Sequence, residues 1–169
     1  MLEIFLITIP SAWRTACEPL LRRCFHFYSR FARGMTLGAR AVVLDDGDRR
    51  VFLVKHSYTP GWHLPGGGVE TGETFLQSVA RELREEGGIE LTGAPQLHGV
   101  FFNRRISRRD HVAVYVVRDW YQEQMPKPNH EIVACGFFDV ASLPPDTTRG
   151  TRLRIEEVLQ NRVLIEDWS

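Results

Sequence analysis

The sequence predicts an α/β fold in which a mixed β-sheet lies between helices, with one further helix ahead of that core. The first observation is an amphipathic helical pattern over 74–87, with short runs rich in β-branched and aromatic residues on both sides. The second is the element order, strands, helix, strands, helix, which is typical of a sheet packed between helices. The third is size: 169 residues with 43% hydrophobic content suffice for one core.

Two strands and a turn precede the central helix. Residues 37–45 (LGARAVVLD) and 51–56 (VFLVKH) have strand composition. The turn residues at 46–48 predict that these strands form a hairpin. A loop follows, and 62–65 lead as a short extended segment into a run of glycines.

The central helix has recognisable ends and an apolar face. Thr74 and Gln77 have the spacing of a capping box, so the helix is expected to start there. Gly87 and Gly88 provide the stop, because glycine adopts left-handed backbone without strain. The side chains that should bury against the sheet recur at helical spacing: Phe75, Leu76, Val79, Ala80 and Leu83.

The opposite face of this helix carries the carboxylates of Glu82, Glu85 and Glu86. Residues three and four apart share a helix face, and grouped like charges are destabilising unless a positive charge lies among them. A bound divalent cation accounts for the cluster, because Mg²⁺ and Mn²⁺ prefer oxygen ligands. The glycines at 66–68 expose backbone groups to a ligand, so the two segments together suit a metal-bound, phosphate-bearing substrate.

After the central helix the chain returns to strands. Residues 90–103 predict one or two strands interrupted near 93–95, and 111–118 and 131–140 each predict one more. Thr147 or Thr148 is the expected cap of a last helix that runs through 162.

Residues 13–33 have a helical pattern of apolar and aromatic side chains accompanied by arginines. We interpret this as an amphipathic helix that packs on the domain or on a second subunit, which leaves a homodimer open. The alternative is peripheral contact with an anionic membrane through the same helix. The chain is therefore divided into an N-terminal extension, 1–35, and a main domain, 36–169.

Charge and cysteine content narrow the class of protein. Lysine plus arginine equals aspartate plus glutamate, at 21 each, so the net charge gives no reason to expect a nucleic-acid partner. Cys17, Cys24 and Cys135 are odd in number and lack metal-type spacing, which predicts reduced thiols in a cytoplasmic protein. The apolar stretch at 1–9 is too short to span a bilayer.

Residues 67–89 resemble a Nudix box, the pattern G-x5-E-x7-R-E-U-x-E-E-x-G-U in which U is aliphatic. Every fixed position is present in this sequence: Gly67, Glu73, Arg81, Glu82, Leu83, Glu85, Glu86, Gly88 and Ile89. A match over so many positions is far more specific than a short glycine pattern. The resemblance covers roughly 36–162 and implies a Nudix-type α/β/α sandwich.

The resemblance also implies an activity. Nudix enzymes are metal-dependent hydrolases that cleave a diphosphate linkage in a nucleoside diphosphate joined to another group, by attack of water on phosphorus. The implied cofactor is Mg²⁺, with Mn²⁺ as the second choice, and the implied partner is a small nucleotide-type substrate. The alternative is a regulatory module that binds nucleotides on the Nudix fold without catalysis, although such modules usually have a damaged box.

Position within the box implies the role of each residue. Glu85 and Glu86 match the family's main metal ligands, and Glu82 matches a position that serves as ligand or general base. Arg81 matches the arginine that orients these glutamates, and Glu73 matches a loop glutamate that assists at the site.

Further residues outside these positions complete the expected site. Gly66 aligns with a glycine whose carbonyl can reach the metal, and Glu131 stands where the family often places another acid, which makes it the second candidate for the general base. Gly67 and Gly68 are expected to contact the substrate.

Arg104 and Arg105, with the arginines at 108 and 109, offer guanidinium groups for phosphate, and the alternative for them is a solvated hairpin loop. The histidines show no metal-ligand spacing. No subfamily signature downstream of the box identifies which diphosphate is the substrate.

Overall fold

The computed structural model describes residue 28, residues 34–160 and residues 162–169. The chain divides into two units, Met1–Met35 and Thr36–Ser169, of which the second contains all the strands and helices below. The helix expected over 13–33 lies outside the described residues apart from residue 28. Cys135 is a free thiol, and the other two cysteines precede the described part of the chain. Within the described ranges, no helix is long and apolar enough to cross a membrane.

A mixed sheet forms the centre of the second unit. The strands, in chain order, are β1 (Thr36–Asp45), β2 (Arg50–His56), β3 (Gly66–Gly68), β4 (Ile89–Leu91), β5 (Gln96–Phe102), β6 (Asp110–Val117), β7 (Trp120–Gln122) and β8 (Ile132–Asp139). The main sheet has the order β5-β6-β1-β2-β8, and β3 also pairs with β1. β1 and β6 run parallel, whereas the other pairs are antiparallel. This confirms the predicted mixed sheet.

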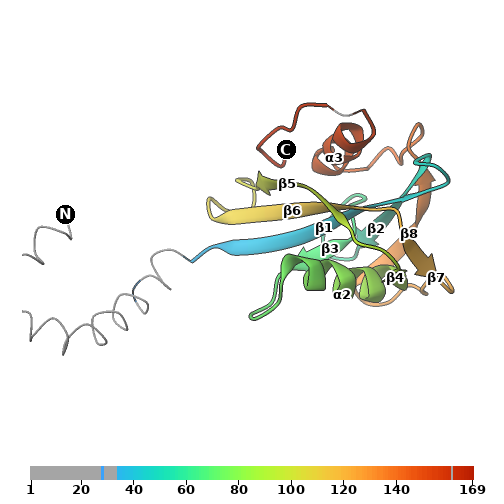
Figure 1. Ribbon diagram of the computed structural model, residues 1–169, viewed down its shortest axis with the longest axis horizontal. Helices are drawn as coiled ribbons and strands as arrows, with labels where there is room; N and C mark the ends of the chain where they lie inside the picture. The colour runs from blue at the N-terminus through green and yellow to red at the C-terminus, as the bar shows by residue number, and fades with distance from the viewer. Residues whose placement is uncertain (1–27, 29–33, 161) are drawn as a thin grey trace, which may run out of the picture. The chain divides into compact units, whose positions relative to one another are not determined.

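Two helices, α2 (Phe75–Gly87) and α3 (Arg149–Gln160), cover opposite faces of the main sheet (Figure 1). Residues alternate between the two faces along each strand. In β1, Ala41 and Val43 belong to the apolar cluster beneath α2, whereas Val42 and Leu44 belong to the cluster beneath α3. The result is the α/β/α sandwich that the box implied.

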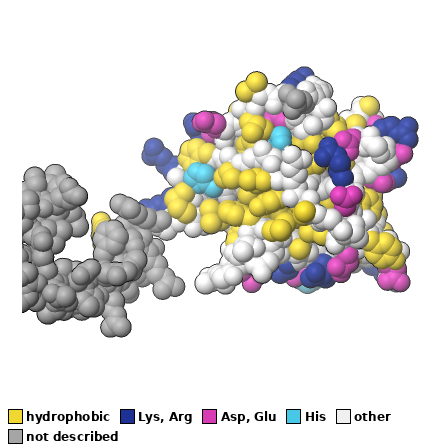
Figure 2. Space-filling model, viewed as in Figure 1, with side chains coloured by type: hydrophobic (Ala, Val, Ile, Leu, Met, Phe, Trp, Pro, Cys, Tyr) yellow, Lys and Arg dark blue, Asp and Glu magenta, His cyan; other side chains and the backbone are white. Residues whose placement is uncertain are grey.

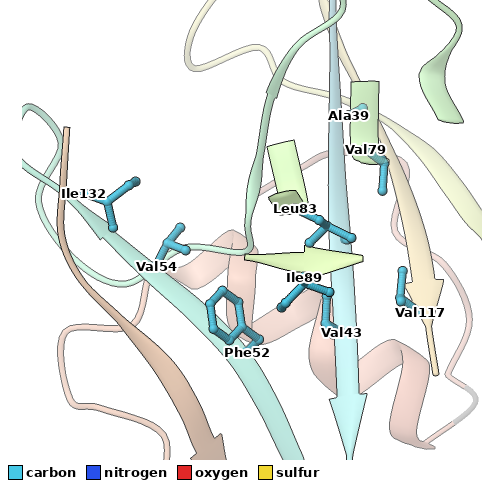
Figure 3. Close-up of a cluster of buried hydrophobic side chains, with 10 residues drawn as sticks. Ala39, Val43, Phe52, Val54, Val79, Leu83, Ile89, Val117 and Ile132 are labelled. Carbon is cyan, nitrogen blue, oxygen red and sulfur yellow. The ribbon is translucent and has the colours of Figure 1, made fainter. Parts of the chain in front are cut away.

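The apolar face of α2 fixes how this helix sits on the sheet. Val79 and Leu83 are almost completely buried, and they pack among Val43 and Phe52 of the strands (Figure 3). Full burial of one leucine side chain contributes about 1.5–3 kcal/mol. Because this face is held against the sheet, the side chains on the other face of α2 are also held in a defined direction.

Two features differ from the expectations. The glycine stretch is not a loop but strand β3, in which Gly66 lies opposite Arg40 of β1. Gly66 has a φ of +134°, and a Cβ there would collide with the backbone of Ala39, so this position requires glycine. The sequence pattern also does not predict β7, which pairs with β4, because three residues are too few to show a period.

Part of the sheet face on the α2 side stays open to solvent. By register, Val100 of β5 lies opposite Ala113 of β6, which lies opposite the buried Ala39 of β1. Val100 and Leu97 are nevertheless 52% exposed. Figure 2 shows hydrophobic side chains gathered over this part of the sheet. Apolar areas of modest size are ordinary on monomeric proteins.

Strand β5 is an edge of the main sheet, and residues 166–168 cover part of that edge. The N–H of Phe102 donates to the carbonyl of Glu166 at 2.8 Å, and the N–H of Trp168 donates to the carbonyl of Phe102 at 2.9 Å. The Trp168 ring packs edge-on to Phe101 and joins the apolar cluster beneath α3. These residues therefore act as a short extra strand at the edge.

Candidate active site

The ends of α2 place its carboxylates close to β3. The hydroxyl of Thr74 accepts from the N–H of Gln77 at 3.2 Å, and the Gln77 side chain accepts from the N–H of Thr74 at 2.8 Å, which confirms the capping box. At the other end, Gly88 has a φ of 61° and donates its N–H to the carbonyl of Arg84. The helix is thus fixed at both ends, where the sequence predicted.

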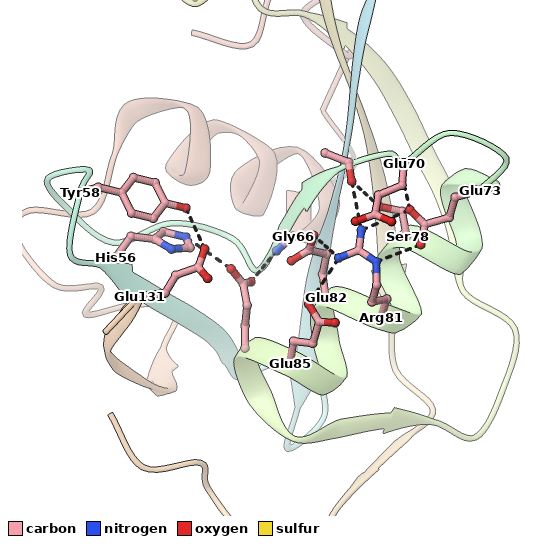
Figure 4. Close-up of polar contacts among 12 residues, drawn as sticks. His56, Tyr58, Gly66, Glu70, Glu73, Ser78, Arg81, Glu82, Glu85 and Glu131 are labelled. Atoms are coloured by element: carbon pink, nitrogen blue, oxygen red, sulfur yellow. Dashed lines mark hydrogen bonds and ion pairs between the residues drawn. The ribbon is translucent and has the colours of Figure 1, made fainter. Parts of the chain in front are cut away.

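Arg81 gathers the carboxylates of the loop and of the helix around one guanidinium group (Figure 4). Its Nη1 lies 2.7 Å from Glu82 and 3.3 Å from Glu85, and its Nε lies 3.0 Å from Glu73. Its Nη2 donates to the carbonyl of Gly68 at 3.1 Å. The Arg81 hydrogen bond lowers the pKa of Glu73, and burial raises the pKa of Glu82 despite this pairing. Arg81 therefore orients these glutamates and ties them to β3.

Glu86 is the buried member of the cluster. Its side chain is only 6% exposed, and one of its oxygens accepts from the N–H of Gly66 at 2.7 Å. Burial raises the pKa of this carboxyl to about 8, although Gly66 and Arg40 act in the opposite direction. Among the described residues, no lysine or arginine forms an ion pair with Glu86. A buried carboxylate without a cationic partner is energetically costly, so binding of a cation by Glu86 would remove that cost.

His56, Tyr58 and Glu131 form the other side of the site. The Tyr58 hydroxyl donates to a carboxylate oxygen of Glu131 at 3.2 Å, and Nε2 of His56 lies 3.5 Å from Glu86 (Figure 4). Burial, helped by the charge of Arg40, lowers the pKa of His56 to about 4. Glu131 immediately precedes β8, so a residue distant in the sequence lies near the carboxylate helix, where its charge acts on Glu86.

Sequence reasoning missed Arg40, His56 and Tyr58. Arg40 is half-buried in β1, where its guanidinium donates to the carbonyl of Leu64 at 2.6 Å. Its signal was an arginine inside an otherwise apolar strand, because lone charges are rarely buried without a function. His56 ends a buried strand and Tyr58 follows it two residues later, and neither carries a comparable pattern.

Of the residues expected to bind substrate, Gly67 and Gly68 lie beside α2, whereas Arg104 forms an ion pair elsewhere. Gly67 lies against α2 so closely that a Cβ there would collide with the Glu82 carboxylate. Gly68 uses its carbonyl for Arg81. Arg104 pairs instead with Asp167 at 3.0 Å.

Arg105 is exposed in the turn between β5 and β6. In the described structure, no hydrogen bond or ion pair joins Arg104 or Arg105 to the carboxylate helix. Their contact with phosphate stays a prediction.

The donor set fits a divalent cation, although the side chains are not gathered into a finished coordination shell. No group of three or more His, Cys, Asp or Glu side chains in the described part of the chain is arranged to hold a metal ion. Glu82 and Glu85 are turned towards Arg81, whereas Glu86 accepts a backbone hydrogen bond from Gly66 and forms no ion pair with a described lysine or arginine. Carboxylate oxygens are the ligands that Mg²⁺ and Mn²⁺ prefer. The fit rests on Glu86, whose burial without a cation partner is otherwise unexplained.

An α/β/α sandwich that places an intact carboxylate helix beside a glycine strand is the arrangement of a Nudix-type domain. The chain belongs to the Nudix family, since the family model for the NUDIX domain matches residues 35–158.

Relatives of known structure and sequence agree with this. A MutT NUDIX hydrolase from Burkholderia pseudomallei is 30% identical with a TM-score of 0.62, over 73% of this chain and 97% of that one. An ADP-ribose pyrophosphatase from Streptococcus suis is 23% identical with a TM-score of 0.57, over 77% of this chain and 96% of that one, and at this identity it shows the fold alone.

Among curated proteins, an RNA pyrophosphohydrolase of Francisella tularensis subsp. mediasiatica is 36% identical over 86 residues, 51% of this chain and 44% of that protein. The chain therefore spans less than half the length of this relative.

Proposed function

We propose that this protein is a metal-dependent pyrophosphohydrolase that cleaves a diphosphate linkage in a small nucleotide-type substrate. The observation that carries the proposal is Glu86, a carboxylate buried within an intact Nudix box that forms no ion pair with a lysine or arginine of the described residues. Nudix enzymes generally use divalent metals, and the family match supports one here. Reduced thiols and a nucleotide substrate favour the cytoplasm as the place of reaction.

Each residue of the site has a part in binding or orientation. The Gly66 N–H fixes one oxygen of Glu86, so that the other, Oε1, is turned to the imidazole of His56. Arg81 holds Glu82 and Glu85 on the same side and ties them to Glu73. A divalent cation bound to these carboxylates would neutralise charge on the phosphate oxygens and lower the pKa of a bound water. We assign Mg²⁺, with Mn²⁺ as the alternative, because the box residues supply oxygen ligands.

Two residues are candidates for the general base. Glu82 is partly buried, which raises its pKa and strengthens it as a base, but it is also held by Arg81 at 2.7 Å. Glu131 is exposed; its carboxylate accepts from the Tyr58 hydroxyl, and its backbone N–H donates to the side chain of Asn129. The pH dependence of kcat in Glu82→Gln and Glu131→Gln separates them. Loss of the general base removes the rise in kcat that accompanies its deprotonation as the pH increases from the acidic side.

The experiment that tests the function is a product-release screen with Mg²⁺ or Mn²⁺. The panel includes nucleoside triphosphates, nucleotide sugars, ADP-ribose and dinucleoside polyphosphates. It also includes an RNA with a 5′-triphosphate, because the relative from Francisella tularensis is an RNA pyrophosphohydrolase. Phosphate or pyrophosphate is measured after the coupling enzyme that each product requires.

The screen compares two matched variants. Glu85→Gln removes a charge from the carboxylate face of α2. Glu90→Gln removes a charge from β4, where Glu90 forms an exposed ion pair with Arg84 of α2. We expect metal-dependent turnover of one substrate class in the wild type and in Glu90→Gln, and almost none in Glu85→Gln. Full activity of Glu85→Gln would refute the assignment of this face. Binding of nucleotide and metal without any turnover would favour the regulatory module instead.

A further inference from the structure

His56 has an unusual position for a histidine that no sequence pattern singles out. It is the last residue of β2, its side chain is only 4% exposed, and it points at the carboxylate helix (Figure 4). Both ring nitrogens are buried and neither has a hydrogen-bond partner in the described structure. Buried polar atoms are nearly always hydrogen-bonded, so a buried imidazole with two open nitrogens requires an explanation.

The groups around His56 are already engaged elsewhere. The Tyr58 hydroxyl donates to Glu131, and Nε2 of His63 lies 3.0 Å from the carbonyl of Pro60. Arg40, whose charge also acts on His56, donates to the carbonyl of Leu64, whereas Oε1 of Glu86 lies 3.5 Å from Nε2 of His56. The other oxygen of Glu86 is held by a backbone N–H, so Oε1 is the atom turned to the imidazole.

The separation of 3.5 Å is too long for a hydrogen bond between an imidazole nitrogen and a carboxylate. It leaves both atoms near enough to reach one ion placed between them. In an octahedral shell with bonds of about 2.1 Å, neighbouring ligand atoms stand roughly 3 Å apart. A small movement would bring Nε2 and Oε1 to adjacent positions on the same cation.

We infer that His56 supplies a nitrogen ligand to the cation that binds Glu86. The inference rests on the proposed function, because it places a further residue on the same metal. A neutral imidazole has the lone pair that a metal ligand needs, and burial disfavours the charged form at this position.

A nitrogen ligand changes which ions the site selects. Sites made only of oxygen suit Mg²⁺, whereas an added imidazole increases the preference for transition metals in the Irving–Williams order. The site would therefore bind Mn²⁺ and Co²⁺ more tightly than Mg²⁺, by a larger margin than the glutamates alone give.

The test uses Mn²⁺ alone, without substrate, and the full chain. Electron spin-echo modulation of bound Mn²⁺ detects a directly coordinated imidazole through its ¹⁴N nucleus. Labelling the protein with [¹⁵N]histidine replaces the ¹⁴N signal of histidine by a ¹⁵N signal without changing any side chain. We expect ¹⁴N modulation in unlabelled protein, its replacement by the ¹⁵N signal in labelled protein, and its loss in His56→Gln. His63→Gln is the matched control, because His63 is the neighbouring imidazole, with its ring 5.8 Å from that of His56.

Mn²⁺ and Mg²⁺ affinities provide the second measurement. His56→Gln should lower the Mn²⁺ affinity about tenfold with little effect on Mg²⁺. Three controls, His63→Gln, Glu86→Gln and a thermal unfolding scan of each variant, separate the outcomes.

Mn²⁺ binding that requires Glu86 but shows no histidine nitrogen would overturn the inference and leave the proposed function standing. Mn²⁺ binding that is absent, or is unchanged in Glu86→Gln, would overturn both.

Discussion

Replacing Glu86 with glutamine should make the metal-free protein more stable at neutral pH. In the folded state burial raises the pKa of this carboxyl to about 8, from an ordinary value of 4.5. Between these values the folded state keeps a proton that the unfolded state has lost. Stability must then fall as the pH rises, because the unfolded state binds fewer protons. Glutamine has no proton to lose and can still accept the hydrogen bond from Gly66.

The size of the effect follows from the pH interval. Each unit between the two pKa values costs about 1.4 kcal/mol of unfolding free energy. From 4.5 to 7 the cost reaches about 3 kcal/mol, and it stops growing above a pH of about 8. For a domain of this size, 3 kcal/mol corresponds to a Tm difference of about 10 °C. Well below pH 4.5 the carboxyl is protonated in both states, so the difference should shrink as the pH falls through 4.5 and then disappear.

The assay is thermal or urea unfolding of wild type and Glu86→Gln in EDTA, from pH 4.5 to 8.5. The unfolding free energies should separate as the pH rises, with the variant more stable. Added Mg²⁺ should raise the Tm of the wild type and reverse the order, because a cation that binds only the folded state stabilises it by mass action. A difference that does not change with pH, or a variant less stable at pH 7 in EDTA, would refute the reasoning.

Three other changes test separate parts of the structure. Arg81→Lys should lower kcat by at least about tenfold while the fold persists, because one ammonium group cannot reach Glu73 and the helix glutamates at once. Steady-state kinetics measure kcat, and a circular dichroism spectrum checks the fold. An unchanged kcat would contradict the orienting role of Arg81. Gly66→Ala should destabilise the protein by at least about 2 kcal/mol, because the added methyl group collides with the backbone of Ala39 at a residue with positive φ. Urea unfolding measures the loss. Gly47→Ala is the control for the collision, because Gly47 also has a positive φ but has open space around it. Thr74→Ala should cost about 1 kcal/mol of unfolding free energy by removing the helix cap, with Thr74→Ser close to wild type; a loss equal in both variants would mean that the cap is not the cause.

The fold and the carboxylate helix were predictable because their signals are local. The capping box at Thr74 and the glycine stop at Gly88 mark the helix to within a residue, and the buried faces of β1 and β2 follow from their apolar runs. The pairing of Glu73 and Glu85 with Arg81 follows from the box and from the helical period.

The remainder depends on contacts between distant parts of the chain. Tyr58 meets Glu131 only because β2 and β8 are neighbours in the sheet, and no short pattern encodes that pairing. His56 becomes a site residue through its depth beside Glu86. The glycine stretch forms β3 because β1 offers it an unpaired edge, which the local composition does not reveal. The buried Arg154, stacked 3.7 Å above Phe101 and paired with Glu157, also looks like an ordinary surface arginine in the sequence.

The cover that residues 166–168 provide for strand β5 has a consequence for how the protein is handled. An uncovered edge strand offers its backbone groups to any other extended chain, which is a common route to self-association. Residues 166–168 occupy part of that edge, next to exposed Val100 and Leu97. A truncation before Leu164 would remove this cover. Recombinant material for any of these experiments should therefore keep this segment intact.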